Sequence, residues 1–326
     1  MNKETKEFER LNRNLLSRLK KIFNSRASNN DADIEELIRL SSKNHHYIPR
    51  YYINGFLGND KEMFVYDKYR DQIRNKKSGS RGVFFEENRN SLQLADNRFI
   101  SIFEEIYCLL DDTLPATIKV LTSDADELTE QLQRDLISSM NIFIVDLFLR
   151  NKNNDAFYDE KFSSARVKVL NSHLNHTTEE IKSVPGVKQL FRAHLFITYL
   201  EEFLRGDPNQ ITQFQLLQFP FEQVCIGDNP ILFLRKEKEL IDLNHTPLIL
   251  PICKTKIYLR NVQRKRPFGY EHVAILNALI IDQSSHLICC SNRKALEDAV
   301  KTYKHMQKGN LFDMFRASLF FDIERD

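Results

Sequence analysis

The amino-acid sequence predicts an α+β protein with a helix-rich middle segment and a small, mostly antiparallel sheet. The chain of 326 residues contains only 9 Gly and 9 Pro, fewer turn formers than an all-β chain of this length needs. Apolar residues recur at helical spacing through the middle, whereas short β-type runs gather near residues 45–67 and 218–290. Strands and helices that cluster in separate parts of a sequence are typical of an α+β fold.

The composition is that of a chain with an ordinary packed core. Lys and Arg number 47 against 45 Asp and Glu, which argues against a protein that binds polyanions over its whole surface but allows a local basic patch. The five cysteines contain no Cys-x-x-Cys pair, so we expect reduced thiols in the cytoplasm. No apolar run reaches the roughly 18 residues of a membrane-spanning helix, so we expect no membrane span.

Residues 1–42 are predicted to form an N-terminal helical extension, with an amphipathic helix over 1–26 whose outer face is basic. One interpretation is an arm that contacts nucleic acid or an anionic lipid surface. The other is a solvated helix that packs on its own domain or on a second subunit. Both stay open, so a homo-oligomer or a protein partner bound through residues 1–26 is a prediction.

Residues 43–295 are predicted to form one α+β domain, followed by a helical tail over 296–326. Its first part contains a short strand over 63–67 and a basic, flexible loop over 70–82. Helical periodicity follows, and the second long helix extends as far as Arg150. The predicted helices are 98–121, 126–150, two or three up to 205, 271–281 and 292–305; the predicted late strands are 219–226, 231–234, 247–251, 256–259 and 285–290.

The residue types that form sites crowd together in the block at residues 44–56. Adjacent His45 and His46 can transfer protons near neutral pH or bind a metal ion. Arg50 and Tyr52 add donors that can hold an anion. If the block is extended, the two histidines point to opposite faces, so we expect one functional histidine, with His46 favoured. The alternative is a structural block with a buried, hydrogen-bonded imidazole.

This block and two later motifs resemble domain-of-unknown-function family 4238, an uncharacterised bacterial family, over about residues 43–295. The resemblance pairs the His-His-x-x-Pro block with the Asp228-Asn229-Pro230 turn, where Gly227 stands in place of the usual serine. It implies a fold but no activity. The remaining parts that the resemblance implies are an acidic helix with Glu105 and Asp112, a helix that ends at Arg150, a proline-led strand at 247–251 and a late helix with Asn277.

Imidazole and carboxylate groups of these motifs suit Zn²⁺, Mn²⁺ or Mg²⁺, and arginine pairs suit a phosphate. A partial likeness to His-Asn-His nucleases ends early, because the next histidine is His173, far beyond a compact motif. The candidate residues are His46, His45 and Asp228 for catalysis, Arg50, Tyr52, Arg150 and Asn229 for substrate binding, and His45, Asp112 and Asp228 for a metal ion.

Two functions follow from these residues. The first is a metal-dependent phosphodiesterase or nuclease that binds nucleic acid, with a role as a bacterial toxin or anti-phage defence effector. The second is a non-catalytic binding or sensor protein that oligomerises or docks a partner through its N-terminal helix. The sequence lacks a Gly-rich phosphate loop, a His-Glu-x-x-His helix and a Gly-x-Ser-x-Gly elbow, which argues against P-loop enzymes, simple zinc peptidases and α/β hydrolases.

Overall fold

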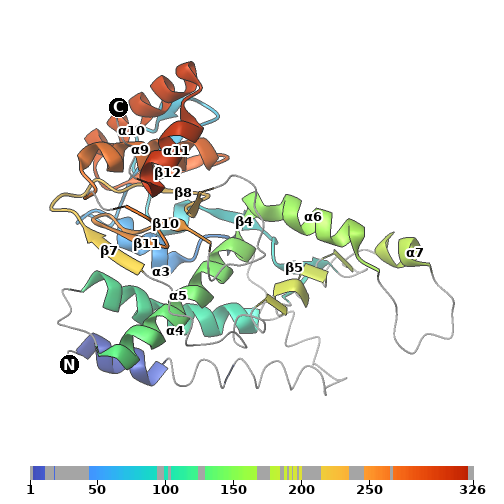
Figure 1. Ribbon diagram of the computed structural model, residues 1–326. Helices are drawn as coiled ribbons and strands as arrows, with labels where there is room; N and C mark the ends of the chain where they lie inside the picture. Colours follow the sequence, from blue (N-terminus) through green and yellow to red (C-terminus); the bar gives the residue numbers. More distant parts are fainter. Residues whose placement is uncertain are drawn as a thin grey trace.

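The protein has an α+β fold in which helices pack around several small antiparallel sheets (Figure 1). This confirms the predicted fold class. The computed structural model describes residues 3–11, 18, 44–93, 99–101, 104–123, 129–166, 177–183, 187–188, 191–192, 194–196, 198–199, 214–234, 246–264 and 267–321.

One four-stranded sheet joins the two ends of the domain, as predicted. Strand β12 (Leu287–Cys290) lies between β2 (Phe64–Asp67) and β8 (Ile226–Gly227), and β3 (Gln72–Ile73) pairs with the outer edge of β2. All three pairings are antiparallel. A strand from the first part of the domain therefore pairs directly with one near residue 290.

A second four-stranded antiparallel sheet has the order β7 (Phe214–Gln218), β11 (Lys256–Arg260), β10 (Leu248–Cys253) and β9 (Leu232–Phe233). Every residue of β10 and β11 is buried, which explains why these runs show no polar alternation in the sequence. Two further antiparallel pairs are β1 (Asn44–His46) with β4 (Phe85–Glu87), and β5 (Ser91–Gln93) with β6 (Phe99–Ser101).

Two long helices cover one side of these sheets (Figure 1). Helix α4 (Glu104–Thr122) contains Pro115, and α5 (Glu130–Arg150) begins after Thr129, whose side chain accepts the Leu132 N–H. From Ser139 to Arg150 every residue of α5 is buried. The shorter helices of this part are α3 (Arg50–Ile53), η1 (Asn54–Phe56), η2 (Ser80–Gly82), η3 (Lys152–Asn154), α6 (Asp155–Ser164) and α7 (Thr178–Ser183).

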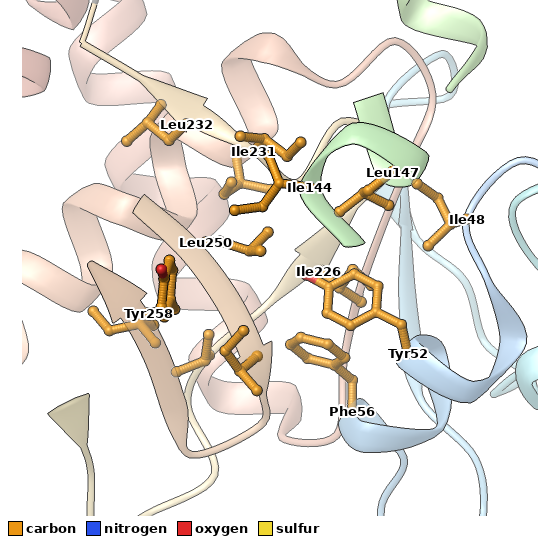
Figure 2. Close-up of a cluster of buried hydrophobic side chains, with 14 of the residues drawn as sticks. Ile48, Tyr52, Phe56, Ile144, Leu147, Ile226, Ile231, Leu232, Leu250 and Tyr258 are labelled. Carbon is orange, nitrogen blue, oxygen red and sulfur yellow. The ribbon is translucent and has the colours of Figure 1, made fainter. Parts of the chain in front are cut away.

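The histidine block enters the core through its aromatic residues. Tyr52 and Phe56 are fully buried, and their rings meet edge to face with centroids 5.3 Å apart. Figure 2 shows both rings gathered with Ile144 and Leu147 of α5 and Leu250 of β10. The block therefore links the late sheet to α5.

Three C-terminal helices lie together at one end of the molecule, beside β12 (Figure 1). They are α9 (Tyr270–Gln283), α10 (Arg293–Gly309) and α11 (Phe312–Phe320). Asn292 caps α10 by accepting the Ala295 N–H, and α10 packs on α9 and β12. The predicted tail over 296–326 is thus part of the packed domain as far as residue 321.

Some predicted segments differ in detail. The predicted strand over 219–226 is strand only at its last residue, in β8, because the pairing with β11 uses the earlier residues 214–218 of β7. The predicted helix over 98–121 begins only at Glu104, and β6 occupies 99–101. The basic loop over 70–82 contains β3 and η2. Most of the extension over 1–42 lies outside the described residues, but 3–11 are helical, Phe8 is buried, and Glu7 lies 3.8 Å from Lys119 of α4. This described part packs on its own domain.

Candidate functional site

The two histidines of β1 point to opposite faces, as an extended block requires. His45 is 3% exposed, and its Nδ1 accepts the backbone N–H of Asn90 at 2.8 Å. This contact ties β1 to the loop before β5. His45 is therefore oriented as a structural residue inside the fold.

His46 lies at the surface of the same strand, partly buried. Its Nε2 is 3.2 Å from the carbonyl oxygen of Ser80, which can only accept, so Nε2 carries the hydrogen and Nδ1 keeps a lone pair. Burial lowers the pKa of His46 to about 4, a shift that the hydrogen bond to Ser80 opposes and that Arg50 and Arg150 reinforce. The imidazole is thus a neutral, oriented base at physiological pH.

Arg150, at the end of α5, is the buried cation beside this imidazole. Its guanidinium donates to both carboxylate oxygens of Asp111, at 2.8 and 3.2 Å, and lies 4.1 Å from the centroid of the Tyr107 ring. Burial opposes its charge, but Asp111 and Asp146 raise the pKa of Arg150 above its usual range. Arg150 is therefore held firmly in one position.

Asp146, one helical turn before Arg150, is completely buried. Its Oδ2 is 3.7 Å from Nη1 of Arg150, and neither oxygen has a hydrogen-bond partner among the described residues. Burial raises the pKa of Asp146 to about 7, against the influence of Arg150. A buried carboxylate without hydrogen-bond donors is costly to maintain.

Two more buried polar atoms of the same neighbourhood also lack partners among the described residues: the hydroxyl of Tyr51 and Nε of Arg150. Burial, followed by the nearby charges of Asp146 and Asp111, raises the pKa of Tyr51 well above its usual range. We call His46, Tyr51, Asp111, Asp146 and Arg150 the polar cluster. Its unsatisfied donors and acceptors can receive water or a polar ligand.

The rim of the polar cluster is basic. Arg50 is exposed at the start of α3, and its charge acts on His46. Arg81 follows Ser80 and is also exposed. Neither arginine forms an ion pair with another residue that the structure describes. Together with His46 they give a cationic, hydrogen-bonding surface.

Three of the predicted site residues lie away from this surface. Tyr52 is fully buried, and its hydroxyl donates to the carbonyl oxygen of Pro251, so it belongs to the core. Asp112 is exposed, because the preceding residue, Asp111, is the one that faces Arg150. Asn229 donates to the carbonyl oxygen of Gln283 and thereby holds the turn against the end of α9.

Asp228 is buried and fully engaged. Its carboxylate accepts the N–H of Ser285 and that of His286, each at 2.8 Å, and the Ser285 hydroxyl at 2.9 Å. Its carbonyl oxygen accepts the Asn151 side-chain amide at 2.7 Å. The turn therefore fastens the start of β12 to the residue that follows Arg150.

The structure does not bring His45, Asp112 and Asp228 together. Within the described ranges, no three His, Cys, Asp or Glu side chains converge on a point where they could hold a metal ion. Of the predicted site residues, Arg50 and Arg150 lie close enough to His46 for their charges to lower its pKa. Likewise, no helix among the described residues is long and apolar enough to cross a membrane.

Sequence reasoning missed Tyr51, Asp111 and Asp146 as site residues. One signal was available for Asp146: it stands four residues before Arg150 in an otherwise apolar stripe, a spacing that places both side chains on one helix face. For Asp111 and Asp112, adjacent acidic residues on one helix, nothing in the pattern distinguished the inward from the outward one.

The fold and the site define an α+β protein in which the charges of a buried arginine–carboxylate cluster act on a partly buried histidine. The chain belongs to the family described as "Protein of unknown function (DUF4238)", whose model matches residues 44–294. That range holds the histidine block, Arg150 and the Asp-Asn-Pro turn, and it confirms the resemblance noted from the motifs. Neither the curated proteins nor the solved structures gave a match.

Proposed function

We propose that the protein hydrolyses phosphodiesters of a nucleic acid, with His46 as the general base. The observation that carries this proposal is the orientation of His46: its Nε2–H is held by Ser80, which leaves the Nδ1 lone pair for substrate or water. Because its pKa is lowered to about 4, the basic form is present at neutral pH.

The charges around His46 support a phosphate-bearing substrate. The charge of Arg50 acts on His46, and Arg81 follows Ser80, whose carbonyl oxygen accepts the His46 hydrogen bond. Both arginines are exposed and have no described ion-pair partner, so they are available to phosphoryl oxygens. In the chain between Arg50 and Arg81, Arg70 and Lys76 are exposed. Lys77 is already paired with Asp60, and Arg74 with Asp67. Several available cations in one segment favour a polyanion over a small phosphate ester.

In the proposed reaction, His46 Nδ1 takes a proton from water as the water oxygen bonds to phosphorus. The bond from phosphorus to the leaving oxygen breaks, and that oxygen takes a proton from solvent. Arg50 stabilises the charge that develops on the phosphoryl oxygens. Since the described residues supply no ligand set for a metal ion, water activation is assigned to His46, and Mg²⁺, Mn²⁺ and Zn²⁺ become variables of the assay.

The test is a cleavage assay of the purified full chain on labelled RNA, single-stranded DNA and duplex DNA. Each substrate is incubated with EDTA, Mg²⁺, Mn²⁺ or Zn²⁺. His46→Gln keeps a side-chain N–H for Ser80 but removes the base, so cleavage should fall by about 10²–10⁴-fold. The matched control is His194→Gln, a change at an exposed histidine, which should cleave like the wild type. Absence of cleavage under every condition, or full activity of His46→Gln, rejects the proposal.

A second candidate is a non-catalytic binding protein, favoured by the two hydrogen bonds that already engage both terminal nitrogens of Arg150 with Asp111. In that case labelled nucleic acid would bind to wild type and His46→Gln equally and stay intact. Fluorescence anisotropy under the same conditions distinguishes the two functions. A role as a toxin or defence effector depends on cleavage: expression of the wild type, but not of His46→Gln, should then arrest bacterial growth.

A further inference from the structure

A partly exposed aromatic ring lies against the proposed base. Phe85 of β4 is 39% exposed and stands directly opposite His46 in the register of β1 and β4. Directly opposed residues of an antiparallel pair share one face, and here the two ring centroids are 5.8 Å apart, with planes at 49°. No step of the proposed hydrolysis uses the Phe85 ring.

The backbone immediately before Phe85 is strained. Phe84 has a φ of 55°, in the left-handed region that a bulky side chain rarely adopts. Its ring is buried edge-on to that of Tyr47, with centroids 6.4 Å apart, and its carbonyl oxygen accepts the Tyr47 N–H at 3.0 Å. Of two adjacent phenylalanines, one is thus anchored in the core and the other is turned outward beside His46. Strain of this kind clusters at functional sites, where it positions a side chain.

Two exposed arginines of the site lie beyond one end of the β1–β4 pair. Because the strands are antiparallel, the chain that continues after His46 and the chain that precedes Phe85 leave the pair at the same end. Arg50 stands four residues after His46, and Arg81 stands four residues before Phe85. A phosphate at this end would meet two guanidinium groups and the imidazole.

The two carboxylates of β4 do not occupy that end. Glu86 points to the other face of the strand and is paired with Arg89 at 3.0 Å. Glu87 lies opposite Asn44, at the end of the pair away from Arg50 and Arg81. The pair therefore has a basic end and an acidic end, and the rings of His46 and Phe85 lie toward the basic end.

We propose that the substrate is a single strand, and that one unpaired base stacks on Phe85 while its phosphate contacts Arg50 and Arg81. This inference rests on the proposed function, in which it makes Phe85 a positioning residue that presents the phosphodiester to His46. A base and its phosphate are joined by a single sugar, so a base held on Phe85 keeps the phosphate beside the imidazole. In a duplex, neighbouring bases cover both faces of each base, so the Phe85 ring has nothing to stack on.

The test is fluorescence anisotropy of the His46→Gln full chain, so that cleavage does not contribute, with labelled oligonucleotides of equal length at one salt concentration. The probes are single-stranded RNA, single-stranded DNA, duplex DNA and a DNA strand in which every base is removed. The abasic strand keeps the phosphates and lacks every stacking partner. We expect single strands to bind more tightly than the duplex, and about tenfold or more tightly than the abasic strand.

Substitutions in this background locate the base. Phe85→Ala and Phe85→Leu should weaken single-strand binding by roughly 5–150-fold and leave the abasic strand unaffected, because each removes the ring. Phe85→Tyr keeps the ring and should bind like its parent. Arg81→Gln should weaken the abasic strand as well, since it removes a phosphate contact. The matched control is Phe221→Ala, which removes a 64% exposed ring that stacks on Tyr270 of α9 and should leave binding unchanged.

Equal binding of the abasic and the base-bearing single strand, or undiminished single-strand binding in both Phe85→Ala and Phe85→Leu, overturns the inference. Either result together with cleavage by the wild type rejects base stacking and leaves the proposed hydrolysis in place. Binding that depends on the Phe85 ring, in a chain that cleaves no substrate, supports the stacking site and rejects the hydrolysis.

Discussion

Asp228 and Asp146 are both completely buried carboxylates, but their surroundings are opposite. Asp228 accepts hydrogen bonds from the backbone of Ser285 and His286 and from the Ser285 hydroxyl, and those three partners fasten β12 in place. Asp146 receives no hydrogen bond from any described residue, and its Oδ2 lies 3.7 Å from Nη1 of Arg150. Asp228 is a buried carboxylate whose hydrogen bonds stabilise the fold, whereas Asp146 is a buried carboxylate without donors, which costs stability.

The two regions are nevertheless connected. Asn151, which follows Arg150, donates its side-chain amide to the carbonyl oxygen of Asp228. The turn at Asp228, whose hydrogen-bonding groups have partners, thereby fixes the end of α5. Helix α5 in turn carries Asp146 and Arg150 of the polar cluster. On this account the Asp-Asn-Pro motif supports the site from behind and takes no part in the chemistry.

The largest effect on stability is expected for Asp228→Asn. An amide nitrogen would face backbone N–H groups that now donate to the carboxylate, so the free energy of unfolding should fall by about 2–4 kcal/mol. Urea unfolding at neutral pH measures this loss. Asp112→Asn, at an exposed position of α4, is the control and should change stability by less than about 0.5 kcal/mol. Equal stability of Asp228→Asn and wild type would remove the distinction between the two carboxylates.

The effect of Asp146→Asn on the free energy of unfolding should depend on pH. The pKa of Asp146 is raised from 3.8 to about 7 on folding, so the folded chain binds this proton more tightly. Stability from this group is therefore fully present below pH 3.8 and is lost as the pH rises through 7, by roughly 2–3 kcal/mol between pH 5 and 7.

Asn cannot ionise, so the difference between variant and wild type should grow in favour of the variant over that range. Urea unfolding at pH 5, 6, 7 and 8 measures the difference, in which the other titrating groups cancel. A difference that does not change with pH would mean that Asp146 is ionised and stabilised in the folded protein.

The smallest effect is expected for Tyr51→Phe. The buried hydroxyl has no described partner, so its removal should leave the free energy of unfolding unchanged or raise it by up to about 1 kcal/mol. Tyr52→Phe is the matched comparison, because that hydroxyl donates to Pro251 and its removal should lower stability by about 1 kcal/mol. Thermal unfolding of the two variants measures both changes. A larger loss of stability in Tyr51→Phe than in Tyr52→Phe would contradict this prediction.

The fold was largely predictable because strong patterns determine it. The apolar stripe of residues 132–148 identifies α5, and the turn formers at 227–230 separate β8 from β9. The site was less predictable because it depends on the rotation of α4 about its own axis. That rotation decides which of two adjacent carboxylates, Asp111 or Asp112, faces Arg150.

The histidine block contains one feature that the sequence predicted and one that it did not. Alternation along a strand predicted that only one histidine would be available, and in β1 His45 is buried while His46 is partly open. That Ser80 would orient His46 was not predictable, because the contact joins residues on separate elements.

The most direct measurement of the central claim is to compare turnover per folded molecule with the free energy of unfolding for His46→Gln and Asp228→Asn, on the best substrate from the cleavage assay. The account predicts that His46→Gln keeps wild-type stability and loses about 10²–10⁴-fold in kcat. It predicts that Asp228→Asn loses stability and keeps kcat. Undiminished kcat in His46→Gln, or loss of kcat in folded Asp228→Asn, would contradict it.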